Sequence, residues 1–459
     1  MIHISGVLPN LAVLAAHRPR RTETGIGALL PWADRLWFVT YVAHKKGTGD
    51  GTGLFYVDSD LRLHKHPASV VGTYANRMIH SESDCAILGP HRIDPEGQVA
   101  TFEDLVDVRL TATCRHLTDP AHKVYFVGME GELFEADVRT LKTTFLTDLK
   151  KELGIHGKTA PHFKSASTNH GRVVVANNSY YPQDFLDPAN CNGRLAEWDG
   201  RAWTVLERTP FNTTACRADA DPLGPAPFAV GQDRASAILK VFLPATGWRT
   251  YRLPKATHTQ DHAYTTEWPR IREVESERWL MDASGMFYEM ACMTYADRVW
   301  GIRPVCSHLR IIGDFCSWRG LLVLAGDQTT PIGDKNLEGG QPQANLWFGK
   351  TDDLWQFGKP AGWGGPWWET PTTAGAPSDP FLMTGFEHKC LHVAHDAGAG
   401  VKIAVQVDFM GTGQWATALV LTTNADGYAH HVFPTGFSAH WVRLVSDRNG
   451  TATAQFHYT

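Results

Sequence analysis

A recurring pattern of short apolar runs separated by tight turns constrains the fold of this chain more than any other feature. The clearest unit, within residues 24–66, has two long runs joined by the turn Ala33-Asp34, then a loop and two shorter runs. Similar units recur about every 50 residues, a spacing typical of the four-stranded blades of a β-propeller. The pattern therefore predicts an all-β fold, with a seven-bladed β-propeller over residues 20–370.

The turn chemistry agrees with this prediction. Residues that tolerate a positive φ angle stand between paired runs, where a β-hairpin needs them, at Met129-Glu130-Gly131, Asp199-Gly200 and Ala283-Ser284-Gly285. The chain has 42 glycines and 26 prolines and is 11% aromatic, a composition that favours strands and turns over helices. Only residues 144–154 look helical, as a short peripheral segment.

The spacing of the apolar runs changes after residue 370. Residues 370–380 are rich in Pro, Gly and Thr, and the alternating runs beyond them no longer follow the 50-residue period. We expect residues 381–459 to form a C-terminal extension of β-strands, either a β-sandwich-like unit or strands packed on the propeller.

Charge and hydropathy exclude several classes of partner. Lys and Arg (43) nearly balance Asp and Glu (48), so the concentrated basic surface that nucleic-acid binding needs is not expected. The apolar runs are far shorter than the roughly 18 residues of a membrane span. No signal peptide is expected, because Pro9 and Asn10 interrupt the apolar start and no basic region precedes it. The oligomeric state stays open.

Polar residues gather where the chain is expected to enter the innermost strands, which surround the channel of a propeller. They include Asn76, Arg77, His80, Arg115, His116, His162, Lys164, Asn212, Arg217, Glu267, Arg270, Arg272, Arg310 and Asp314. A buried ring of Arg and His is costly to desolvate unless an anion or water compensates it, so we expect an acidic ligand. The alternative is that these side chains cap loop carbonyls or pair with carboxylates of the next blade.

Proton-transfer chemistry has its own candidates. His170 lies at an expected hairpin turn, and Tyr180 and Tyr181 end the following run; histidine and tyrosine serve as base and acid in proton abstraction next to a carboxylate. The alternative is a solvent-facing turn histidine and ordinary core aromatics. No H-E-x-x-H spacing, nucleophile elbow, P-loop or dinucleotide fingerprint is present. We expect no catalytic metal and no required cofactor, while a bound calcium, which needs no regular spacing, stays open.

Several segments resemble one family of carbohydrate enzymes: residues 21–44, 75–83, 112–140, 265–276 and 436–459. They are similar to the seven-bladed propeller enzymes that remove the rhamnose cap of arabinogalactans, a family of α-L-rhamnosidases and L-rhamnose-α-1,4-D-glucuronate lyases. The resemblance implies an acidic oligo- or polysaccharide substrate and a secreted or periplasmic location. It also implies release of terminal α-L-rhamnose linked 1,4 to D-glucuronic acid.

The resemblance implies two different sites. Its hydrolases depend on one histidine on one face of the propeller, which His44 matches here, with His17 as the fallback. Its lyases use the central pocket on the other face, which would correspond to His80, His116, His170 and the arginines. We expect hydrolysis at His44, with β-elimination at the central pocket as the alternative. A propeller that binds glycan without catalysis is the third reading, because a fold does not fix a function.

Overall fold

The computed structural model describes residues 13–14, 17–18, 24–42, 48–49, 53–156, 161–179, 192–216, 227–260, 269–291, 299, 301–329 and 342–459. Within these residues nearly all regular structure is strand, so the prediction of an all-β fold is confirmed. The expected helix at residues 144–154 is instead strand β15 (Thr143–Asp148) followed by the four-residue helix α1 (Leu149–Glu152), which Asp148 caps by accepting from the Lys150 amide. The remaining helical turns are η1 (Ser81–Ser83), η2 (Glu103–Leu105) and η3 (Thr351–Gln356). None of the described helices is long and apolar enough to cross a membrane.

Up to residue 349, the described strands group into seven antiparallel sets of four. In chain order, the first set is β3 (Thr24–Trp32), β4 (Arg35–Val42), β6 (Leu54–Val57) and β7 (Leu63–Lys65), and the second is β8 (Arg77–His80), β9 (Cys85–Leu88), β10 (His91–Ile93) and β11 (Val99–Thr101). The third set is β12 (Leu110–Arg115), β13 (Lys123–Gly128), β14 (Glu132–Asp137) and β15 (Thr143–Asp148). The fourth set is β16 (Phe163–Asn169), β17 (Arg172–Asn177), β18 (Arg194–Trp198) and β19 (Trp203–Glu207).

The last three sets are β20 (Phe211–Ala215), β21 (Phe228–Gln232), β22 (Ala237–Leu243) and β23 (Gly247–Leu253); β24 (Arg270–Glu275), β25 (Arg278–Ala283), β26 (Met286–Ala291) and β27 (Arg303–Ser307); β28 (Ile312–Trp318), β29 (Leu321–Thr329), β30 (Pro342–Gly349) and β1 (Val13–Leu14). A separate pair joins β2 (His17–Arg18) to β5 (Thr48–Gly49). The seventh set takes its outer strand, β1, from the start of the chain, and so ties the two ends of this region together.

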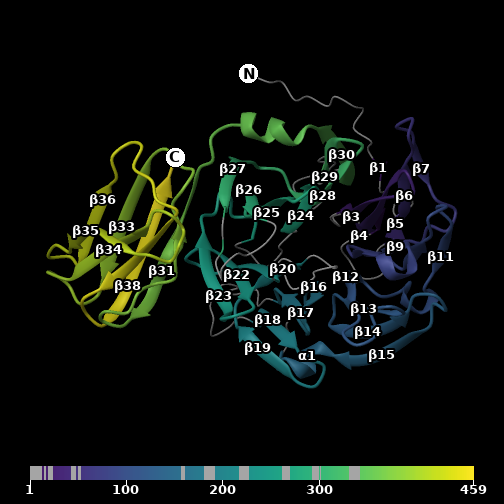
Figure 1. Ribbon diagram of the computed structural model, residues 1–459, viewed down its shortest axis with the longest axis horizontal. Coiled ribbons are helices and arrows are strands. Elements are labelled where there is room, and N and C mark those ends of the chain that lie inside the picture. Colours follow the sequence, from purple (N-terminus) through teal and green to yellow (C-terminus); the bar gives the residue numbers. More distant parts are fainter. Residues whose placement is uncertain are drawn as a thin grey trace.

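The first strands of the sets lie next to one another. β3, β8, β12, β16, β20, β24 and β28 each contact the next in this order, and β28 contacts β3. Figure 1 shows the sets following one another around a common centre. Two glycines allow this approach, because an added Cβ would lie 2.1 Å from the Tyr74 carbonyl oxygen at Gly27 and 2.2 Å from the Ile26 carbonyl oxygen at Gly313.

Burial falls from the first strand of a set to the last. In the third set, β12 is almost entirely buried, whereas β15 is half-buried or exposed throughout. Short strands buried on both faces explain the continuous apolar runs of the sequence, as in β22, whose seven residues are all buried. The sheet faces therefore pack against neighbouring sheets, and the last strands face outward.

The C-terminal region forms two further sheets, shown in green and yellow in Figure 1. Their strands are, in sheet order, β31 (Gly362–Thr372), β38 (Gly450–Tyr458), β33 (Lys389–His395) and β36 (Tyr428–Val432); then β32 (Phe381–Leu382), β37 (Trp441–Ser446), β34 (Lys402–Asp408) and β35 (Ala416–Thr422). Apolar residues from both sheets, such as Leu391 and Ile403, share one buried cluster, and Phe381 stacks on Phe456 at 5.2 Å. We call these two packed sheets the C-terminal sandwich; it includes β31, which precedes residue 381.

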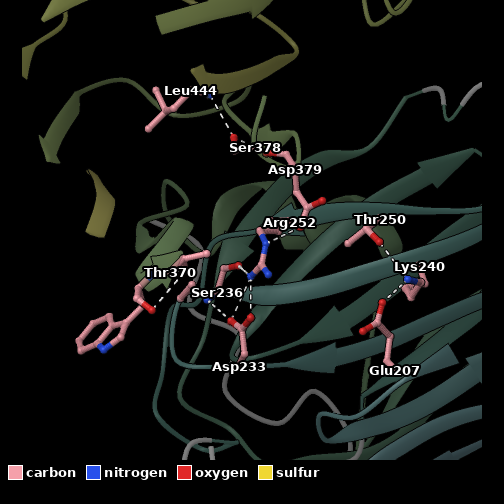
Figure 2. Close-up of polar contacts among 12 residues, drawn as sticks. Glu207, Asp233, Ser236, Lys240, Thr250, Arg252, Thr370, Ser378, Asp379 and Leu444 are labelled. Carbon is pink, nitrogen blue, oxygen red and sulfur yellow. Dashed lines mark hydrogen bonds and ion pairs between the residues drawn. The ribbon is translucent and has the colours of Figure 1, made fainter. Parts of the chain in front are cut away.

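The C-terminal sandwich is continuous with the fifth set of strands. β32 pairs in parallel with β23 through Arg252 and Phe381. The Arg252 guanidinium lies between Asp233 of the fifth set and Asp379 of the connecting segment, as Figure 2 shows, and donates to both carboxylates. The same buried apolar cluster extends from the sandwich into the fifth and sixth sets.

Candidate functional site: a central arginine cluster

Three arginines surround one buried carboxylate where the first strands begin. Arg77 starts β8, Arg270 starts β24 and Arg272 follows two residues later, while Asp314 lies on β28. Arg272 Nε donates to Asp314 Oδ1 over 2.8 Å, and the Nε atoms of Arg77 and Arg270 lie 3.6 and 4.0 Å from the same carboxylate. We call these four residues the central arginine cluster.

The backbone fixes Asp314 in place. Its Oδ2 accepts from the Leu29 amide over 2.8 Å, and its Oδ1 accepts from the Phe315 amide over 2.9 Å. Burial would raise the pKa of this carboxyl, but the three arginines together hold its pKa below the ordinary value. Asp314 is therefore ionised at neutral pH, although its side chain is completely buried.

Arg270 reaches across the centre to backbone carbonyls of three other segments. It donates to Gly313 over 3.1 Å, to Gly27 over 3.3 Å and to Ala75 over 3.5 Å. Burial and the neighbouring Arg272 lower the pKa of Arg270 to about 9. Burial and Arg272 likewise lower the pKa of Arg77 to about 10. Burial is the larger cause of both shifts in pKa, and repulsion from the neighbouring guanidinium of Arg272 adds to it.

The cluster suits an anionic group. Its four side chains carry a net positive charge, because three guanidinium groups share one carboxylate. The side chains of Arg77 and Arg272 keep 19% and 15% of their surface exposed, whereas Arg270 keeps 4%. A planar guanidinium that is partly exposed in a low-dielectric site binds a carboxylate strongly.

A chain of buried amides runs past the starts of neighbouring sets. Asn178 Nδ2 donates to Asn212 Oδ1 over 2.8 Å, and Asn212 Nδ2 donates to Gln232 Oε1. Gln232 Nε2 then donates to the Gln260 carbonyl over 3.1 Å, and Ser284 Oγ donates to Gln260 Oε1 over 2.8 Å. Asn212 is the second residue of β20, which contacts β24 and hence the strand that begins with Arg270. We call these five residues the amide chain.

His80 is held by hydrogen bonds at the end of β8. Its Nε2 donates to the Pro120 carbonyl over 2.8 Å, and its Nδ1 accepts from Ser83 Oγ over 2.7 Å. Burial lowers its pKa, so the ring is neutral at pH 7. Asn76 precedes the start of the same strand, so the two residues are roughly 13 Å apart along the backbone.

Arg115 and His116 lie near His80, at the end of β12. Arg115 forms an ion pair with Glu82. His116 Nε2 donates to Glu135 over 2.7 Å, its Nδ1 accepts from the Asp119 amide over 2.9 Å, and its ring stacks on Tyr125 at 4.4 Å. Both residues thus pair with carboxylates, as in the alternative, but Glu82 belongs to the preceding set and Glu135 to the same set, instead of the next blade.

Asn76 lies at the other end of the inner strands, with Arg270. Its Nδ2 donates to the Gly89 carbonyl over 2.8 Å and to Thr113 Oγ1 over 2.7 Å, and its buried Oδ1 has no partner among the described residues. His170 instead follows the last residue of β16, in the turn to β17, with a φ of 47°. Its ring lies 5.7 Å from that of Phe242, and burial lowers its pKa.

The structure thus divides the sequence candidates between two ends of the inner strands. Asn76 and Arg270 lie at the starts, while His80, Arg115, His116 and His170 lie at or just after the ends. His17 lies on β2, of which the structure describes the backbone. His44, Arg217, Glu267, Tyr180 and Tyr181 lie outside the described residues.

Two features of the site were not predicted from the sequence. Gln232 ends an ordinary apolar run and Gln260 lies in a loop, so neither stands at the start of an inner strand. A buried pair, Asp282 and His308, joined at 3.0 Å, was also missed, because one residue lies next to the end of a strand and the other follows a strand. Gln232 has one signal, a lone polar residue closing the apolar run 228–231. Among the described residues, no group of three His, Cys, Asp or Glu side chains is arranged to hold a metal ion.

Comparison with known proteins adds little at the level of sequence. No family model matches this chain, and no curated protein matches it. Among solved structures, a nidogen/laminin complex is similar with a TM-score of 0.34 at 9% identity, covering 59% of this chain and 89% of that chain. The Cps50 (Swd1) β-propeller domain of Myceliophteria thermophila is similar with a TM-score of 0.41 at 10% identity, covering 72% of this chain and 98% of that chain.

Proposed function

We propose that the seven sets of strands are the blades of one closed seven-bladed β-propeller over residues 20–370. Two observations support closure: the first strands contact one another in a complete cycle, and β1 pairs with β30. In that architecture the first strands line the axis, and the central arginine cluster lies on it.

We propose that this propeller is a carbohydrate-active enzyme whose substrate carries a uronic acid. The observation that carries the proposal is the central arginine cluster, in which three guanidinium groups share one carboxylate and two of them keep exposed surface. A sugar carboxylate bound there would accept from Arg77 and Arg272, the two guanidinium groups of the cluster that keep exposed surface. Together with the sequence resemblance, this favours release of terminal α-L-rhamnose linked 1,4 to D-glucuronic acid.

The reaction we propose is hydrolysis, with His44 as acid and base. In this scheme the cluster binds and orients the uronate, and the amide chain keeps the inner strands in register beside it. A lone histidine is a reasonable proton carrier near neutral pH. The proposal needs no metal or other cofactor, and it implies a secreted or periplasmic setting, where such glycans occur.

β-Elimination is the second candidate, and the same cluster favours it. Arginines around the uronate carboxylate neutralise its charge and make the C5 proton more acidic, so that a base could remove it while rhamnose leaves from C4. Both ring nitrogens of His80 and His116 are already bonded. All three histidines lie at or just after the ends of the inner strands, away from the cluster, so the base for a uronate bound at the cluster would have to be another group at the starts of the strands.

One experiment separates these chemistries. Purified protein is incubated with gum arabic, and free rhamnose and ultraviolet absorbance are read together. Hydrolysis predicts free rhamnose without new absorbance, and elimination predicts both, because it leaves an unsaturated uronate. Binding of the gum without either product would support the third reading, a non-catalytic glycan-binding propeller, and would overturn the proposed enzyme.

A further inference from the structure

The C-terminal sandwich contacts one turn of the fifth set directly. The turn covers residues 233–236, between β21 and β22. Its Ala235 carbonyl accepts from the Gly365 amide over 3.0 Å and from Gln455 Nε2 over 3.3 Å, both in the sandwich. Gln455 is nearly buried, and the same Nε2 also donates to the Trp367 and Ala454 carbonyls over 3.1 Å.

Arg252 holds the same turn from the other side. It donates to both oxygens of Asp233, at 2.8 and 3.0 Å, and to Ser236 Oγ over 3.0 Å. Its Nε donates to Asp379 over 3.0 Å, which links the turn to the segment leading into β32 (Figure 2). Lys255 Nζ completes the contacts by donating to the Asp233 carbonyl over 2.6 Å.

The residue just before this turn belongs to the amide chain. Gln232 immediately precedes it, is completely buried, and joins Asn212 to Gln260. Its backbone amide donates to the Pro210 carbonyl over 3.0 Å, next to the start of β20. A displacement of the turn would therefore move the Gln232 amide group, and with it Asn212 on the inner strand next to β24.

We propose that the C-terminal sandwich helps to fix the geometry of the central site. In this proposal Gln455 and Arg252 are positioning residues that hold Gln232 in place and, through it, the other residues of the amide chain. The effect on activity rests on the proposed function, whereas the effect on the turn does not. The competing account is that the turn holds itself through Asp233 and Ser236, whose backbone atoms bond one another and whose Asp233 Oδ1 accepts from the Ser236 amide over 3.0 Å. In that account the sandwich packs against the fifth set without influencing the turn.

The test uses the full chain with Gln455→Met, which keeps the length of the side chain and removes its donors. Gln406→Met is the matched control, because Gln406 also lies in the sandwich and accepts from Arg443 over 2.8 Å but does not contact the turn. Backbone hydrogen exchange is read for peptides covering residues 228–243. We expect exchange about tenfold faster in Gln455→Met and unchanged in the control, because the opening of a turn depends on its local contacts. Equal exchange in both variants would overturn the proposal.

Arg252→Lys gives a second reading if Gln455→Met fails to fold. Lysine keeps the charge but loses the fork that spans Asp233 and Asp379. We expect the same peptides to exchange about tenfold faster. For rhamnose release from gum arabic we expect kcat to fall about tenfold in either variant with little change in KM, since orientation rather than charge is lost. Unchanged exchange would overturn the proposal, and absence of release by the unaltered protein would overturn only the proposed function.

Discussion

Arg272 Nε donates to Asp314 Oδ1 over 2.8 Å, although the two residues are 42 positions apart and lie on the first strands of different sheets. The pair lies at the centre of the fold, where the carboxylate also accepts from the Leu29 amide. One side chain thus joins the first, sixth and seventh sets of strands. The charged residues that we propose for ligand binding therefore also hold sets of strands together.

Asp314→Asn should destabilise the protein strongly. The variant keeps the shape of the side chain but removes the buried carboxylate that Arg77, Arg270 and Arg272 share, a loss that typically costs about 3–5 kcal/mol. The free energy of unfolding in urea measures this loss. Asp34→Asn is the matched control, because Asp34 pairs with Arg319 on the exposed surface at 2.8 Å, where a pair contributes about 0–1 kcal/mol. Equal effects of the two substitutions would contradict the central role of Asp314.

The contribution of Asp314 should depend on acid pH. Because its pKa in the folded protein lies below the unfolded value, its stabilisation is present in full above that unfolded value, about pH 4, and is lost as pH falls through the folded pKa. The difference in stability between the unaltered protein and Asp314→Asn should therefore shrink below about pH 4. Unfolding measured from pH 7 to pH 3 tests the sign, and a gap that widens on acidification would contradict it.

His91 should make the protein sensitive to mildly acid pH. Burial lowers its pKa from 6.5 to about 4, so the unfolded chain takes up a proton before the folded chain does. The stabilisation is complete above pH 6.5 and is lost as pH falls towards 4, on the order of 3 kcal/mol. His91→Gln should flatten the pH dependence of the unfolding free energy in this range. An unchanged slope would show that the pKa of His91 is the same in the folded and the unfolded chain, and would contradict this prediction.

Gly313→Ala should destabilise without changing the fold. The added Cβ would lie 2.2 Å from the Ile26 carbonyl oxygen on the neighbouring inner strand, so β28 and β3 would have to separate. Overpacking of this kind costs typically 1–3 kcal/mol. Thermal unfolding measures the loss, and an unchanged far-ultraviolet circular dichroism spectrum shows that the strands persist. An unaffected melting temperature would contradict the close contact of the inner strands.

The periodic apolar runs predicted the strands well, because a strand buried on both faces has a short, continuous apolar sequence and turn residues separate one such strand from the next. The turn at Ala33 and Asp34 is one example, with φ angles of 48° and 57°. The helix expected at residues 144–154 was wrong over most of its length: Thr143–Asp148 pair with β14, because edge pairing outweighs local helix preference.

The candidate site was harder to predict, because side-chain partners depend on distances between strands. The sequence marked Arg270, Arg272 and Asp314 as polar residues near inner strands, and the structure brings them together. It could not show that His116 would turn to Glu135 instead, a partner on the third strand of its own set. The amide chain depends on the packing of several sets, which no local pattern records.

His44→Gln tests the hydrolytic reading. Glutamine keeps hydrogen-bonding capacity and approximate size but cannot carry a proton, so rhamnose release should fall by about 10²-fold or more. Release is measured as free rhamnose from gum arabic. Full release by this variant, accompanied by ultraviolet-absorbing product, would assign the reaction to β-elimination instead.

The most direct measurement of the central claim compares kcat/KM for rhamnose release by Arg272→Gln and Arg319→Gln. Arg272 belongs to the central arginine cluster, whereas Arg319 is an exposed arginine paired with Asp34, so its loss controls for the change in net charge. If the cluster binds the uronate, Arg272→Gln should lose about 10²-fold in kcat/KM while Arg319→Gln keeps the value of the unaltered protein. A folded Arg272→Gln variant that releases rhamnose as fast as Arg319→Gln would contradict the claim that this cluster binds the acidic sugar.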